Sequence, residues 1–278
     1  MLREDNEKVG EVLKRIKKHS GHKNIRIVNR GNAAVFCALM VAKRINPRPY
    51  VLIPDQGGLT CYKKCPSFYN FAVKEVKTNY GIIDIEDLKL HAKTASALLY
   101  PAMAGYFAMQ EVKSICKACR NAGCLVIMDV SACFPHKKLC KGKFADLLTC
   151  GFSHGEAVNY GYGGFVSSIK PEYLDAAKDA FSLFKVHPQL TKEIMPFISP
   201  KRVEGLVLLA EKVKKDLKKY DILHKDRKGI NVVVKFTPDI IGYCQKKGYK
   251  YNLCPSYSRV NEKAISIELK AQENGEKK

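Results

Sequence analysis

Short apolar runs alternate with amphipathic stretches through the first 170 residues of the chain. The amphipathic stretches repeat their apolar residues at helical spacing, as in a helix predicted at Met109–Arg120, and the apolar runs have the length of buried strands. Strands that alternate with helices predict an α/β fold, with a mostly parallel sheet covered by helices on both faces. The predicted strands are Ile25–Val28, Tyr50–Pro54, Phe71–Val76, Ala95–Tyr100, Cys124–Val130, Ala145–Phe152 and Gly164–Ile169.

The pattern changes after Ile169. Three prolines, at 188, 196 and 200, interrupt it before a long basic helix predicted at Val203–Tyr220. Period-2 strands follow at Val232–Phe236 and Ala264–Leu269, around a helix at Asp239–Lys247. We therefore predict a large domain over residues 1–200 and a small C-terminal α+β domain over residues 201–278.

Composition narrows the class of protein. The 278 residues are 46% hydrophobic, enough for a large core, and no apolar run reaches the roughly 18 residues of a membrane span. The first residues are charged and lack the apolar stretch of a signal peptide. Eleven cysteines without an export signal indicate reduced thiols. We expect a cytoplasmic protein that does not enter a membrane.

A formal net charge of +21 predicts attraction to polyanions. The strongest basic patch is expected on the helix at 203–220 and the loop after it, with Val207, Leu208, Val213 and Leu217 facing inward. Two interpretations stay open, namely RNA binding, with tRNA as a possible partner, and a lysine-rich composition without a partner. Nothing in the pattern indicates DNA. The basic residues are Lys212, Lys214, Lys215, Lys218, Lys219, Lys225, Arg227 and Lys228.

The cysteine spacings offer a rival hypothesis. Cys116, Cys119 and Cys124, and separately Cys61 and Cys65, have spacings compatible with zinc or iron–sulfur ligation. Cys116 and Cys119, however, lie within a predicted helix and lack the turn of a metal knuckle. We predict ordinary thiols and no metal.

Polar residues follow several predicted strands at their carboxyl ends, where parallel sheets bind ligands. Asn32, Tyr100, Asp129 and Ser153 lie at or just past such ends, which predicts one shared site. The turn Gly31-Asn-Ala33 precedes a helix and can offer free N–H groups to a phosphate. A carboxylate at the end of the apolar strand needs a partner, although Asp129 can also cap the following loop.

The string Gly161-Tyr-Gly-Gly164 resembles the Gly-Glu-Gly-Gly tetrad of DegT-type sugar aminotransferases. Over residues 25–270 the order of elements resembles type I pyridoxal phosphate (PLP)-dependent transferases, including phosphoseryl-tRNA:cysteine synthase. This resemblance implies a homodimer and a phosphate at the turn 31–33. It also implies a pyridine nitrogen on Asp129, cofactor contacts from Ser131 and Ser153, and a substrate carboxylate on Arg259.

One departure from that family is large. Between Lys143 and Lys170 the chain has no lysine or arginine, although the resemblance places the Schiff-base lysine there. The DegT spacing puts Glu156 at its position, and alignment on His154 puts Gly155 there. Without the amine no Schiff base forms. We therefore expect PLP or pyridoxamine phosphate (PMP) to bind non-covalently with His154 or Glu156 as general base, or else a non-catalytic scaffold for RNA or a protein partner.

Overall fold

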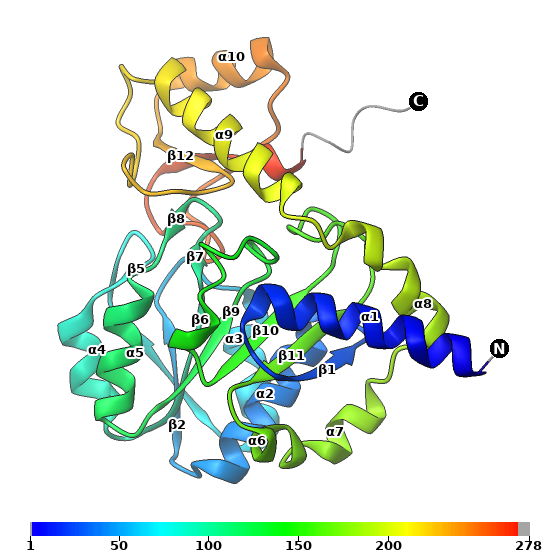
Figure 1. Cartoon of the computed structure of the whole chain (residues 1–278). Coiled ribbons are helices and arrows are strands. Elements are labelled where there is room, and N and C mark those ends of the chain that lie inside the picture. Colours follow the sequence, from blue (N-terminus) through cyan, green and yellow to red (C-terminus); the bar gives the residue numbers. More distant parts are fainter. Residues whose placement is uncertain (1, 272–278) are drawn as a thin grey trace.

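Residues 2–271 are described by a computed structural model with a large domain below a smaller one (Figure 1). A seven-stranded sheet forms the centre of the large domain. β11 runs antiparallel to both of its neighbours, and the other neighbouring strands are parallel. The strands, in spatial order, are β1 (Asn24–Val28), β11 (Gly164–Ser168), β10 (Leu147–Gly151), β9 (Leu125–Asp129), β6 (Ala95–Pro101), β2 (Tyr50–Pro54) and β3 (Ala72–Val76).

Helices cover both faces of this sheet, so the predicted α/β architecture is confirmed. The five inner strands are buried on both sides: in β2, Leu52 packs into one core, whereas Val51 and Ile53 pack into the other. α2 covers the second face, and α4 and α5 lie together over the first (Figure 1). The helices are α1 (Leu2–Ser20), α2 (Gly31–Ile45), α3 (Thr60–Lys64), α4 (Ile85–Ala92), α5 (Val112–Asn121), α6 (Pro171–Asp175), α7 (Lys178–Leu183) and α8 (Pro188–Glu193).

Two short hairpins flank the main sheet, β4 (Thr78–Asn79) with β5 (Ile82–Ile83) and β7 (Met103–Ala104) with β8 (Ala108–Met109). The second hairpin corrects a prediction. The helix expected from Met109 begins three residues later, at Val112, because Met109 pairs with Met103 as a strand.

The C-terminal part contains a separate three-stranded sheet with its own apolar core. We call residues 201–271 the small domain. The predicted strands and helices are present there, and the sequence pattern missed the short strand β13. Its elements are α9 (Lys201–Asp216), β12 (Val232–Lys235), α10 (Pro238–Lys247), β13 (Tyr251–Leu253) and β14 (Ala264–Ile267).

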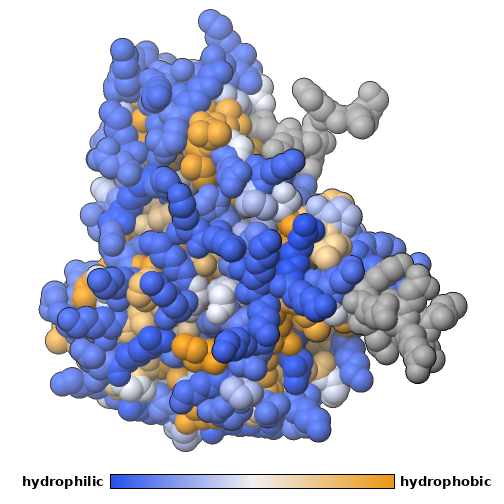
Figure 2. Space-filling model, in the orientation of Figure 1, coloured by the Kyte–Doolittle hydropathy of each residue, from blue (hydrophilic) through white to orange (hydrophobic). Residues whose placement is uncertain are grey.

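Hydrophilic residues cover most of the face shown in Figure 2, and apolar residues appear between them only in small areas.

Two predictions about α9 are corrected by its packing. Leu208 was expected inside but is 71% exposed, and Lys214 was expected in solvent but is buried. The ammonium of Lys214 instead bonds to Glu211 and to the carbonyl of Arg227. No helix within residues 2–271 is long and apolar enough to span a membrane.

Candidate functional site

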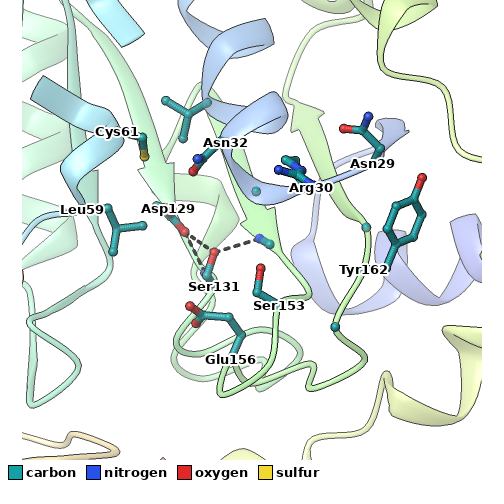
Figure 3. A pocket seen from close by; sticks show the side chains of 15 residues that line it. Asn29, Arg30, Asn32, Leu59, Cys61, Asp129, Ser131, Ser153, Glu156 and Tyr162 are labelled. Carbon is teal, nitrogen blue, oxygen red and sulfur yellow. Dashed lines mark hydrogen bonds between the residues drawn. The ribbon is translucent and has the colours of Figure 1, made fainter. Parts of the chain in front are cut away.

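A cavity of about 330 Å³ lies at the carboxyl ends of β9 and β10, beside the first turn of α2 (Figure 3). Five of the predicted cofactor residues line it together: Gly31, Asn32, Asp129, Ser131 and Ser153. They come from three separate strand ends of one sheet edge, which is why residues about 120 positions apart meet.

Asp129 is the last residue of β9 and points to the α2 side of the sheet, because Ile127, two residues earlier, packs there. Only 5% of it is exposed. One carboxylate oxygen accepts from the Ser131 amide at 2.9 Å and hydroxyl at 2.6 Å, and the other accepts from the Tyr62 hydroxyl at 2.9 Å. Within residues 2–271 it forms no ion pair.

Burial raises the pKa of Asp129 to about 6. The hydrogen bonds from Ser131 and Tyr62 oppose this shift, and the charge of Glu156 adds to it. The Ser131 hydroxyl also accepts from the Gly151 amide at 2.8 Å, so Ser131 ties the ends of β9 and β10 together.

The first turn of α2 forms another wall of the cavity. Its N-cap residue, Arg30, makes no side-chain cap, and the first turn holds no acidic residue. The N–H groups and the positive end of the helix dipole therefore suit an anion. Gly31 packs against Gly151 so closely that a Cβ would lie 3.0 Å from the Gly151 Cα. The third turn residue, Ala33, is buried outside the cavity lining.

The two candidate bases lie in different surroundings. Glu156 lines the cavity, and its side chain rises toward Ser131 and Asp129 (Figure 3). His154 is exposed and packs beside Gly161, where a Cβ would meet its Nε2. Of the two, only Glu156 is placed to act on a ligand in this cavity.

Arg259, predicted to hold a substrate carboxylate, lies in a buried ion pair with Glu268. Its Nε and Nη2 donate to the two carboxylate oxygens, each at 2.7 Å, and its Nη1 donates to the Ser258 carbonyl. Only 6% of the residue is exposed. A substrate carboxylate would therefore compete with Glu268 for this guanidinium.

Tyr100 was expected at the shared site, but its side chain is buried in the core on the opposite face from Asp129. The sequence analysis missed Tyr106, Arg202 and Lys270, which surround Glu156. The Tyr106 hydroxyl donates to Glu156 Oε1 at 2.8 Å, and Arg202 Nε donates to the Glu156 carbonyl at 3.2 Å. No periodicity marks these residues, and Arg202 and Lys270 reach the surroundings of Glu156 only through the docking of the small domain.

The cysteines are all free and buried. Within residues 2–271 no group of three or more His, Cys, Asp or Glu side chains is arranged to hold a metal ion. Cys61 lines the cavity near Asp129, and a hydrogen bond to Cys65 together with burial raises the pKa of its thiol.

No family model and no curated protein matches this chain. Solved structures do match its fold. DndA from Streptomyces lividans has a TM-score of 0.74 and 10% identity, covering 95% of this chain and 88% of that one. An apo cysteine desulfurase from Thermococcus onnurineus has a TM-score of 0.71 and 12% identity, covering 98% and 82%. SepCysS, in a complex with the SepCysE N-terminal domain, has a TM-score of 0.70 and 15% identity, covering 95% and 80%.

At these identities the likeness shows the fold alone. The chain has the type I fold of PLP-dependent transferases, so the predicted fold is confirmed. The narrower resemblance to DegT-type enzymes, the homodimer, and the RNA or tRNA partner stay predictions.

Proposed function

We propose that this chain binds PLP or PMP in the cavity at Asp129 without a covalent bond to a lysine. The observation that carries the proposal is Asp129 itself. It is a buried carboxylate with a raised pKa and no cation partner in the described chain, and a protonated pyridine nitrogen would be such a partner.

The remaining walls fit the same group. The uncapped first turn of α2 suits a phosphate, and the Ser153 hydroxyl points into the cavity below it (Figure 3). No lysine lies among the residues that line the cavity, and the β10–β11 loop has none from 144 to 169. When bound, the cofactor supplies an electron sink for chemistry at an amino-group carbon.

Of the two candidate bases, Glu156 is the one that can perform acid–base chemistry in this cavity, because His154 is exposed and lies outside the cavity lining. Tyr106 holds one of the Glu156 oxygens, and burial raises the pKa of Tyr106, so its hydroxyl stays a donor. Glu156 is thus fixed in position to take a proton from a bound ligand.

The test is a titration of the purified protein with PLP and with PMP, followed by absorbance at roughly 300–500 nm, where pyridine cofactors absorb. We expect saturable binding, and Asp129→Asn should weaken it about tenfold or more, since a charge-assisted hydrogen bond is lost. Asp146→Asn is the matched control, because Asp146 is a similarly buried aspartate that precedes β10, outside the cavity lining.

Borohydride reduction and peptide mass mapping complete the experiment. We expect no lysine to be modified in a stoichiometric, site-specific way. A pyridoxyl group on a single lysine would mean that a lysine from elsewhere in the chain binds the cofactor covalently. That result would overturn the non-covalent part of the proposal. Absence of saturable binding by either form would overturn the proposed function.

The alternative function, a scaffold that binds RNA through its basic surface, is favoured by one observation. Of the basic residues predicted around α9, six stay exposed: Lys212, Lys215, Lys218, Lys219, Lys225 and Lys228. Others are engaged, since Lys214 is buried and Arg227 pairs with Glu111 at 2.8 Å.

A further inference from the structure

The two carboxylate oxygens of Glu156 have different surroundings. Oε1 accepts from the Tyr106 hydroxyl, whereas Oε2 is buried and has no hydrogen-bond partner among the described residues, 2–271. A buried acceptor without a donor is costly, and here it belongs to a residue that lines a cavity of ligand size. The missing donor is therefore one that a ligand can bring.

Two cations lie at the ring of Tyr106, the residue that donates to Glu156. The Lys270 ammonium lies 3.3 Å from the centroid of the Tyr106 ring, and the Arg259 guanidinium lies over the same ring at 4.9 Å. Cations at a phenol ring make its hydroxyl a stronger donor. Burial lowers the pKa of Lys270, and the negative charge of Glu156 opposes that shift.

Asp129 and Glu156 place two carboxylates at one cavity, and the charge of Glu156 contributes to the raised pKa of Asp129. A ligand with two separate cationic N–H groups relieves this repulsion and supplies the donor that Oε2 lacks. PMP has both groups, a pyridinium and an ammonium. PLP has an aldehyde oxygen in place of the ammonium, and that oxygen faces Oε2 as acceptor against acceptor.

We propose that Glu156 makes this cavity selective for the amine form of the cofactor, with the ligand ammonium donating to Oε2. The inference rests on the proposed function and narrows it. Where the resemblance places a lysine that would bind an aldehyde, this chain has a carboxylate that binds an amine.

Three ligands test this proposal by calorimetry at neutral pH: PMP, PLP and pyridoxine 5′-phosphate. The last carries a neutral hydroxyl at the same position and does not react with surface lysines, so it isolates the charge of the amine. We expect PMP to bind about tenfold or more tightly than either of the others. Glu156→Gln should lower the affinity for PMP and bring the three dissociation constants close together.

Glu193→Gln is the matched control. Glu193 accepts from the Tyr160 hydroxyl at 2.6 Å, the same pairing as Glu156 with Tyr106, but it is exposed and lies outside the cavity lining. This variant should keep the full preference for PMP.

The outcomes separate the two proposals. No binding of any of the three ligands would overturn the proposed function and this inference with it. Equal affinities in the unmodified protein, or tighter binding of PLP, would overturn the selectivity alone and leave the cofactor site standing. Because the unmodified protein gives this comparison by itself, the test stands even if Glu156→Gln does not fold.

Discussion

In the absence of ligand, Asp129 should destabilise the fold at neutral pH, and Asp129→Asn measures by how much. The side chain is buried with three donors but no cation partner within residues 2–271. Its pKa rises from an ordinary value of 3.8 to about 6. A shift of this size corresponds to about 3 kcal/mol against the ionised form.

The sign follows from the direction of the shift. The folded state binds the proton more tightly than the unfolded state, so ionising Asp129 costs stability as the pH rises. Below about pH 3.8 both states are protonated and the cost is absent, and above about pH 6 it is fully present. The unfolding free energy of the unmodified protein should therefore fall, relative to Asp129→Asn, by about 3 kcal/mol between acidic and neutral pH.

Urea denaturation of both proteins under reducing conditions, at a series of pH values, measures this difference. Asparagine keeps the shape and can still accept from Ser131, so the charge is the main change. Asp146→Asn should act in the opposite direction at neutral pH and destabilise by about 1–3 kcal/mol. Asp146 pairs with Arg120 at 3.2 Å and accepts from the Val126 amide at 2.8 Å. A pH-independent difference between the unmodified protein and Asp129→Asn would refute the reasoning.

Two further predictions concern the helix start and the basic surface. Gly31→Ala should lower the unfolding free energy by about 1–3 kcal/mol, since its Cβ would press on the Gly151 backbone at 3.0 Å. Gly205→Ala, at an open helical position, should raise it by about 0.5–1 kcal/mol, and equal effects in urea denaturation would contradict this contrast. If the basic patch binds RNA, affinity should fall with salt by a log–log slope of roughly −0.7 per phosphate neutralised on a single strand. Charge reversal of the exposed Lys215 and Lys218 should flatten that slope, and an unchanged slope would argue against RNA at this surface.

Much of the large domain follows from local pattern. Its inner strands are short apolar runs buried on both faces, and such runs stand out against the charged stretches between them. β13 was missed for the opposite reason, because two of its three residues are exposed and it lacks a clear alternation. Leu208 shows the limit of helical periodicity, which identifies an apolar stripe but not what packs against it.

The residues of the site likewise divide into those that could be predicted from the sequence and those that could not. Asp129 and Asn32 could be predicted, because each lies at or shortly after the end of a strand and the carboxyl ends of parallel strands share an edge of the sheet. Tyr106 and Lys270 could not, because 163 positions separate them in the sequence and their contact depends on how the small domain docks. The burial of Lys214 likewise depends on its bond to the loop carbonyl of Arg227, which no helix pattern contains.

Tyr106 contacts both a residue that lines the cavity, Glu156, and the junction with the small domain. Its hydroxyl holds Glu156, while its backbone carbonyl accepts from the amides of Ile230 and Asn231 at 2.8 and 3.0 Å. Its backbone has a φ of 69°, which a tyrosine adopts at a cost, so these contacts hold it in place. We therefore expect the docking of the small domain and the occupancy of the cavity to be thermodynamically linked through Tyr106. If a ligand binds more tightly when the small domain is docked, its binding stabilises the docked arrangement by the same free energy. The docking of the small domain would then respond to the occupancy of the cavity.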